Sequence, residues 1–400
     1  MKPAIVVVAY NRPRALGRLL DSLSRAIYPE DSGGVSLIIA SDRGEDAGAR
    51  EVAALADGFR WRFGPKEVIK QVSHLGLVRH FRECGRLALK HGAVILLEDD
   101  LAVAPPFYDF TAQVLERCEV EPRIGGVCLY GLWFNGFTQE PFLPIEDGSD
   151  VFFLRLPYTQ GLAFTAAQWQ SFEDWSQRTE RGPHPDLPEA FLRFGPDEWF
   201  PELAYYLVSS GKFFCFPRVS LIVGWGDEGT HFSGRTSWLQ TPLQIGTRPS
   251  QQLKTLDDAF AVYDAFYEIL SARLRTLAPA LPDVDFDVDL NAIKKPFNLH
   301  SDYVLTMRPV QKALTSFGLR MYPPEMNVIE AVPGSEIALA RREDVYWDAW
   351  AELEARRRLH AYAWARRRPS RRQTAAFLAA NLVQAFRRWR DRLAREGPVD

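Results

Sequence analysis

The chain has 400 residues and a formal net charge of −3, with 46% hydrophobic and 25% charged residues. This length and composition are those of an ordinary globular protein with room for more than one structural unit, and a charge near neutrality gives no reason to expect a nucleic-acid partner. The four cysteines show no metal-ligand spacing, which favours reduced thiols in a cytosolic setting over a disulfide framework or a zinc site.

The N-terminal quarter alternates between short apolar runs and helical patterns. Strands are predicted at residues 5–9, 35–40, 68–69 and 94–97. Helices are predicted between them at residues 16–23, 50–55 and 76–91. This alternation is typical of a parallel sheet with right-handed crossovers. No glycine-rich dinucleotide fingerprint follows the first strand, which disfavours an NAD-binding domain.

Three adjacent carboxylates, Glu98, Asp99 and Asp100, follow directly on the fourth predicted strand. Neighbouring like charges raise one another's pKa unless a cation or hydrogen-bond donors lie between them. Mg²⁺ and Mn²⁺ prefer carboxylate oxygens and commonly bridge them to phosphates. Open α/β sheets bind ligands at the carboxyl ends of their strands. The sequence therefore suggests a metal–diphosphate site here, and a solvated turn with an aspartate as helix cap is the alternative.

The next part of the chain continues the mixture of strands and helices. Strands are predicted at residues 125–133, 151–156, 213–216 and 219–223, and helices at 107–120, around Trp169 and at 203–208. Pro196 predicts a helix start that places Asp197 and Glu198 in the first turn, where acids favour the helix dipole. A glycine-rich loop at residues 224–232 carries His231.

After residue 247 long helical patterns predominate, and no internal repeat is present. Helices are expected at residues 253–277, 302–319, 337–358 and 373–393. The expected organisation is therefore a first domain over residues 1–246 and a mainly helical region over residues 247–400 that ends in a basic amphipathic tail.

The basic tail combines arginine clusters with apolar residues. The clusters lie at residues 356–358, 366–368, 371–372 and 387–388. A helix of this kind can lie on an anionic membrane surface, or it can pack on the first domain or on a second copy. The apolar run at the N-terminus is too short for a signal peptide, and no other run is long enough to cross a bilayer. We expect a cytoplasmic protein, either soluble or peripheral at the inner face of the membrane.

Three segments resemble parts of the GT-A-fold glycosyltransferases. Residues 7–13, Val-Val-Ala-Tyr-Asn-Arg-Pro, are similar to the opening strand and turn of that fold. Residues 96–107 are similar to the Glu-Asp-Asp-Leu form of its DxD motif, and residues 196–199, Pro-Asp-Glu-Trp, to the segment that supplies the base of inverting enzymes. The likeness covers about the first 235 residues. It is strongest to family-2-like bacterial sugar transferases and to the N-acetylglucosaminyltransferase that begins complex N-glycans.

The resemblance implies a Rossmann-like α/β fold with a mixed, mainly parallel sheet flanked by helices. It also implies the transfer of a hexosyl or N-acetylhexosaminyl group from a nucleotide-sugar donor, with UDP as the favoured nucleotide and with inversion at the sugar. The acceptor would be a glycan or a lipid-linked molecule, as in polysaccharide biosynthesis. Mn²⁺ or Mg²⁺ would be bound by Asp100 and His231, and the base would be Asp197 or Glu198, with Asp197 preferred. The donor-binding residues would be Tyr10, Arg12, Asp42, Arg79, Glu98, Asp99 and Gly161.

Other interpretations stay open at this point. Asp42 can be a turn or helix cap after a strand, and Arg12 a surface charge. A nucleotidyltransferase would also use an α/β sheet and acids, but residues 11–14, Asn-Arg-Pro-Arg, are not the glycine- and lysine-rich phosphate loop of those enzymes. A non-catalytic glycan-binding or scaffold subunit is the alternative from outside the enzymes.

Overall fold

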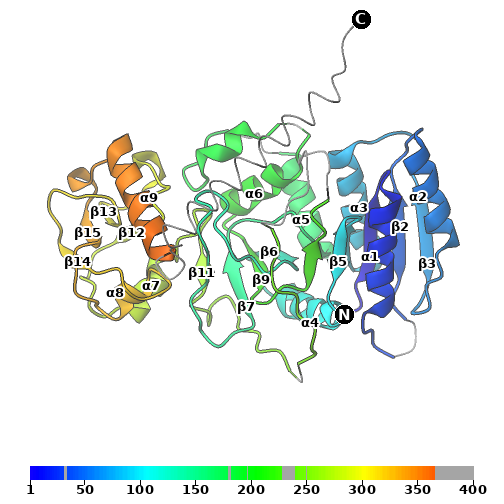
Figure 1. Ribbon diagram of the computed structural model, residues 1–400, viewed down its shortest axis with the longest axis horizontal. Helices are drawn as coiled ribbons and strands as arrows, with labels where there is room; N and C mark the ends of the chain where they lie inside the picture. Colours follow the sequence, from blue (N-terminus) through cyan, green and yellow to red (C-terminus); the bar gives the residue numbers. More distant parts are fainter. Residues whose placement is uncertain (31–33, 179–181, 196, 228–238, 249, 365–400) are drawn as a thin grey trace, which may run out of the picture.

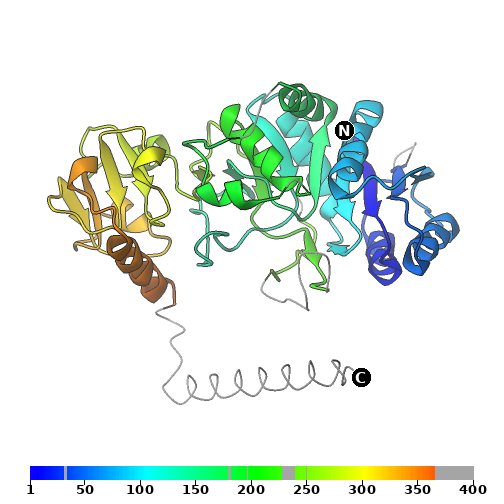
Figure 2. The ribbon, with the colours of Figure 1, turned by 90° about the horizontal axis from the view of Figure 1, so that it is seen from above.

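The structure is a computed structural model that describes residues 1–30, 34–178, 182–195, 197–227, 239–248 and 250–364. Two lobes lie side by side along the long axis of the molecule, and the view from above shows the same division (Figures 1 and 2). Within the described residues, the large lobe is built on a nine-stranded sheet and the small lobe on a four-stranded sheet.

One half of the large sheet is entirely parallel. Its strands, in spatial order, are β4 (Ala93–Glu98), β1 (Ala4–Ala9), β2 (Leu37–Ser41) and β3 (Lys66–Lys70). The helices that connect them are α1 (Pro13–Arg25), α2 (Ala47–Gly58) and α3 (Leu77–His91). β1 and β2 are buried along their whole length because helices cover both faces of the sheet, which explains their unbroken apolar sequences.

The other half of the large sheet is mixed. Its strands, continuing from β4, are β8 (Leu162–Thr165), β6 (Ile124–Cys128), β9 (Phe213–Pro217), β7 (Val151–Leu154) and β11 (Val262–Tyr263). The associated helices are α4 (Phe107–Glu119), α5 (Ala166–Ser176), the 3₁₀ helix η1 (Glu189–Arg193) and α6 (Phe200–Ser209). Five pairs of neighbouring strands are parallel and three are antiparallel. The expected α/β class, with a mixed and mainly parallel sheet flanked by helices, is confirmed.

The helices form a layer on each face of the large sheet. α1 and α2 carry the chain from β1 through β2 to β3, and right-handed crossovers place both on one face. α3 returns from β3 to β4 and therefore covers the other face, where it packs against α5. The two helices meet at Gly85, because an added Cβ there would lie 2.0 Å from the ring of the buried Trp169.

The small lobe is also a sheet with helices around it. Its strands, in spatial order, are β12 (Phe286–Asp289), β13 (Tyr303–Thr306), β15 (Ile337–Arg341) and β14 (Thr315–Phe317). Its helices are α7 (Ser271–Leu277), the 3₁₀ helices η2 (Pro296–Asn298) and η3 (Arg342–Asp344), α8 (Met326–Ile329) and α9 (Ala349–Ala363). The mainly helical character expected after residue 247 therefore does not hold for the described residues of this region.

Of the predicted C-terminal helices, the one at 302–319 is wrong and two others are only partly correct. Residues 253–277 form β11 and a tight turn, and only Ser271–Leu277 are helical, as α7, while residues 302–319 form β13 and β14. The predicted helix at 337–358 divides into β15 and α9. Many of the apolar residues that recur at helical spacing in 253–277 are buried, but outside α7 they are not helical, and Asp264 closes the turn by accepting the backbone N–H groups of Phe266 and Glu268. The helix expected at 373–393 lies outside the described residues.

The lobes are joined by polar contacts, of which those at Tyr263 are buried. The hydroxyl of Tyr263, on β11, donates a 2.9 Å hydrogen bond to Oε1 of Glu325 and accepts one of 2.7 Å from the backbone N–H of Ile145. At the end of α9, His360 and Trp364 both reach the carboxylate of Glu140, at 2.6 and 2.7 Å. These contacts tie α8 and α9 of the small lobe to the large one.

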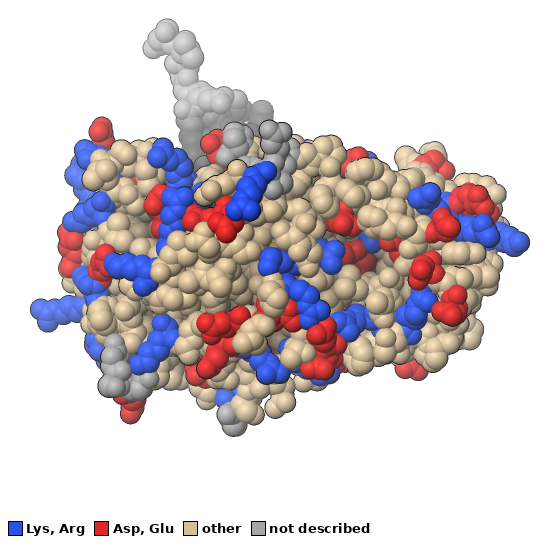
Figure 3. Space-filling model, turned by 180° about the vertical axis from the view of Figure 1, so that it is seen from behind, with Lys and Arg blue, Asp and Glu red and all other residues tan. Residues whose placement is uncertain are grey.

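Charged side chains of both signs are interspersed over the face seen in Figure 3. All four cysteines are buried and unbridged. Among the described residues, no helix combines the length and apolar character needed to span a bilayer. Most of the basic tail, from residue 365 on, lies outside the described residues, so its contact with a membrane stays a prediction.

Candidate active site

The candidate site lies where three neighbouring parallel strands end. β1 leads into Tyr10 and Arg12, β2 into Asp42, and β4 into the cluster of Glu98 with its two following aspartates. Because the strands are parallel and adjacent, their carboxyl ends share one edge of the sheet, which is where open α/β sheets bind ligands. The fold therefore brings together side chains that are far apart in the sequence.

Arg12 clamps the two aspartates of the cluster. Its side chain starts from the N-cap of α1, where Pro13 begins the helix. Nη1 donates a 2.9 Å hydrogen bond to Oδ2 of Asp100, and Nη2 donates to Oδ1 of Asp99. Burial lowers the pKa of Arg12, but the charges of Asp99 and Asp100 outweigh it and raise that pKa above its ordinary value. Arg12 is therefore part of the site and not a surface charge.

The acids of the cluster are held in an environment that disfavours their charge. Burial, followed by the charge of Asp100, raises the pKa of Glu98 to about 8, although Arg12 and a hydrogen bond from Trp199 lower it. Burial also raises the pKa of Asp99 to about 6 against the opposing effect of Arg12. Three carboxyl groups thus face one guanidinium, so the cluster has an excess of negative charge that an added cation would neutralise.

The donor set fits a hard divalent cation. Asp99 and Asp100 offer carboxylate oxygens, and the side chain of Asp100 is 29% exposed, so an ion bound there can keep water or phosphate ligands. The described residues contain no group of three or more histidine, cysteine, aspartate or glutamate side chains placed to hold a metal ion. His231, the other expected ligand, lies outside the described residues.

Asp42 is buried and organises the loop before α3. Its Oδ1 accepts the backbone N–H groups of Arg43 and Leu75, at 2.8 and 2.9 Å, and its Oδ2 accepts that of Gly76 at 3.0 Å. The same loop carries His74, whose ring centroid lies 5.2 Å from that of Tyr10. The contact of His74 with Asp42 joins residues that are distant along the chain, so no local sequence pattern shows it.

The segment expected to supply the base lies beside the acid cluster. Trp199 stacks on Phe81 with 4.1 Å between ring centroids, and it hydrogen-bonds Glu98. Asp197 is exposed and Glu198 is half-buried. The predicted helix start is wrong, because α6 begins at Phe200, and both acids precede the helix instead of lying in its first turn.

Two further expected donor residues have contrasting surroundings. Gly161, just before β8, has a φ of +59°, and an added Cβ would lie 2.4 Å from Cδ1 of Ile222. The structure thus gives it a role in packing β8 against β10 (Ile222–Gly224). Arg79 is exposed in the first turn of α3, just after the loop that Asp42 organises.

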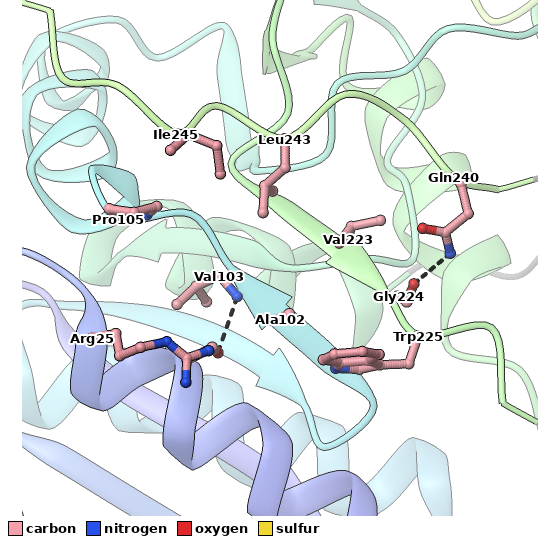
Figure 4. Close-up of a pocket in the computed structure, with 11 residues that line it drawn as sticks. Arg25, Ala102, Val103, Pro105, Val223, Gly224, Trp225, Gln240, Leu243 and Ile245 are labelled. Carbon is pink, nitrogen blue, oxygen red and sulfur yellow. Dashed lines mark hydrogen bonds between the residues drawn. The ribbon is translucent and has the colours of Figure 1, made fainter.

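A groove lies along the two-stranded ribbon of β10 and β5 (Leu101–Val103), which follows the acid cluster in the chain. Its volume is about 440 Å³, and Figure 4 shows Trp225 at one end and Pro105 and Ile245 at the other. The backbone N–H of Trp225 donates a 3.0 Å hydrogen bond to the backbone carbonyl of Asp100, which joins the groove to the cluster. The guanidinium of Arg18 lies 4.8 Å from the centre of the Trp225 ring.

Neither a protein-family model nor a curated protein matches the chain. Among solved structures it is similar to S. aureus TarS (13% identity, 56% of this chain, 36% of that chain, TM-score 0.33). It is also similar to the mannosyltransferase PcManGT from Pyrobaculum calidifontis in complex with GDP-Man and Mn²⁺ (14% identity, 55% and 58% of the chains, TM-score 0.32). A third similar structure is that of GalNAc-T7 with UDP, GalNAc and Mn²⁺ (14% identity, 55% of this chain, 42% of that chain, TM-score 0.35). The chain thus spans less than two thirds of each of these proteins, and likeness of this extent leaves the activity to be inferred from the site.

Proposed function

We propose that this protein is a metal-dependent glycosyltransferase of the GT-A kind, which moves a sugar from a nucleotide-diphosphate donor to a hydroxyl group of a glycan or lipid-linked acceptor. The observation that carries this proposal is the cluster of Glu98, Asp99 and Asp100 at the end of β4, faced by Arg12 at the end of β1. Three acids facing one guanidinium suit a cation and a diphosphate better than they suit a purely structural turn. We favour UDP as the nucleotide and an inverting reaction.

Asp100 and Asp99 are the residues that would hold Mn²⁺ or Mg²⁺, and we keep His231 as a further proposed ligand. Such an ion supplies positive charge that stabilises the departing diphosphate. Arg12 is already positioned between the same carboxylates and adds a fixed positive charge at this edge of the sheet. Glu98, which directly precedes these two aspartates at the end of β4, is the residue we propose to contact the sugar.

We propose Asp197 as the base that takes the proton of the acceptor hydroxyl, with Glu198 as a supporting residue. An inverting transfer needs one carboxylate in this role. Asp197 is exposed to an incoming acceptor, and the contact between Trp199 and Glu98 holds its segment beside the donor site.

We place the acceptor in the groove that begins at Trp225. Trp225, at one end of the groove, hydrogen-bonds the backbone of Asp100, and the groove is lined mainly by apolar groups. Indole rings stack readily on the apolar faces of sugars, while the apolar length beyond Trp225 suits an acceptor with a hydrophobic portion.

The direct test is thermal unfolding of the purified protein with UDP, GDP, CDP or ADP, each with and without Mn²⁺. A ligand that binds only the folded state raises the Tm by mass action, so we expect a shift with at least one nucleotide that requires the metal. Asp100→Asn should remove this shift. Asp21→Asn, which changes an exposed acid on α1, is the matched control and should retain it. Absence of a shift with all four nucleotides would contradict the donor site.

A further inference from the structure

The carboxylate of Asp42 is buried and is bound by the backbone of its own loop. A carboxylate has about four lone-pair positions for hydrogen bonds. Three are used by the backbone N–H groups of Arg43, Leu75 and Gly76, and Nδ1 of His74 lies 3.0 Å from Oδ2. The Asp42 side chain is only 4% exposed. A base could reach Asp42 only if this loop moved, so Asp42 serves to position the loop.

The same contacts fix the proton on His74. Its Nδ1 lies 3.0 Å from Oδ2 of Asp42 and 3.0 Å from the backbone carbonyl oxygen of Arg43. Both oxygens can only accept, so the proton is assigned to Nδ1. In the neutral ring this leaves a lone pair on Nε2. The side chain of His74 is 58% exposed, so Nε2 of the neutral ring is an accessible hydrogen-bond acceptor.

Tyr10 provides a flat surface next to this acceptor. It directly follows β1 and is 37% exposed, and its ring is tilted by 34° from that of His74. The ring is held from behind by Gly44, where an added Cβ would lie 3.0 Å from Cε2 of Tyr10. An aromatic ring of this kind is a stacking platform for any base, because every base has a π face, so it does not choose among bases.

We infer that His74, and not Asp42, selects the base of the donor, by accepting a hydrogen bond at Nε2 from a base stacked on Tyr10. The inference rests on the proposed nucleotide site. Uracil, thymine and guanine carry an N–H in the ring on their pairing edge, whereas cytosine and adenine carry a lone pair at that position. An acceptor facing a lone pair loses its hydrogen bond. The site therefore takes donors with uracil, thymine or guanine and disfavours those with cytosine or adenine.

The test is to measure the Kd values of UDP, GDP, CDP and ADP in the presence of Mn²⁺. One hydrogen bond corresponds to about tenfold in affinity, so UDP or GDP should bind about tenfold more tightly than CDP and ADP. His74→Ala should bring the preferred nucleotide to the level of the others. His74→Arg, which presents only donors, should move the preference towards CDP. The matched control is His300→Ala, in the small lobe, which should keep the wild-type preference.

The outcomes separate this inference from the proposed function. If the wild-type protein binds none of the four nucleotides, the proposed donor site fails and the inference fails with it. If UDP or GDP binds but His74→Ala keeps the full preference, or if CDP or ADP is preferred by the wild type, the donor site stands and the role of His74 is refuted. The Tm of each variant without nucleotide shows whether the loop still folds.

Discussion

The buried carboxyl group of Glu325 should make the stability of this protein depend on pH. It lies between the lobes, where it accepts the hydrogen bond of Tyr263. Burial raises its pKa from an ordinary value of 4.5 to about 7. Between these two pH values the folded state keeps a proton that the unfolded state has released. Because the folded state binds more protons in this window, the free energy of unfolding falls as the pH rises from 4.5 to 7.

The size of this effect follows from the distance between the two pKa values. At 1.36 kcal/mol for each pKa unit, the change from 4.5 to about 7 corresponds to about 3 kcal/mol. Glu325→Gln replaces the neutral carboxyl group by a neutral amide of similar shape that cannot ionise. The variant should match the wild type near pH 4.5 and be more stable than it by about 3 kcal/mol above pH 7.

Urea unfolding followed by tryptophan fluorescence at pH 4.5 and pH 8 measures this difference. Glu330→Gln, at an exposed position just after α8, is the matched control and should shift the free energy of unfolding equally at both pH values. If Glu325→Gln also shifts it equally at both, burial does not control this carboxyl group and the reasoning is refuted.

Three further changes test the site and the core. Asp197→Asn should lower kcat by at least about 100-fold, as loss of a general base does, with the Kd for the nucleotide unchanged; a small change in kcat would exclude Asp197 as the base. Trp225→Ala should raise the KM for the acceptor without changing the Kd for the nucleotide, and an unchanged KM would remove the acceptor from the groove. Gly85→Ala should cost about 3 kcal/mol or more in urea unfolding, because the buried ring of Trp169 cannot move aside, whereas Gly58→Ala, with open space around it, should cost nothing.

The sequence predicted the parallel half of the sheet well for a physical reason. Strands such as β1 and β4 are buried on both faces, so their apolar runs are short and unbroken, and few other structures fit them. The acid cluster could be recognised in the sequence for a related reason. Three carboxylates directly after a buried strand are energetically unfavourable unless a cation or hydrogen-bond donors lie next to them. Their partner, Arg12, was nominated only through the resemblance, because β1 and β4 are neighbours in space and not in sequence.

The errors arose where three-dimensional contacts produce a misleading pattern. Residues 253–277 show helical spacing because many of their apolar side chains are buried, and the turn at Asp264 has only a weak sequence signal. The role of His74 depends on two oxygens, of which one belongs to Asp42 at the end of another strand. No periodicity in the sequence contains that information.

The nine-stranded sheet ends differently on its two sides, and this determines how the protein can be divided. An open edge presents unpaired backbone groups that recruit other chains. On one side, β3 carries Lys66, Glu67 and Lys70, whose charges oppose such pairing. On the other side, β7 is covered by the two residues of β11, which lie beyond residue 246. A protein shortened to its first 246 residues would expose an edge that reads Val-Phe-Phe-Leu at residues 151–154 and should aggregate. The chain completes the large sheet on its way into the small lobe, so the two lobes are best produced, studied and engineered as one piece.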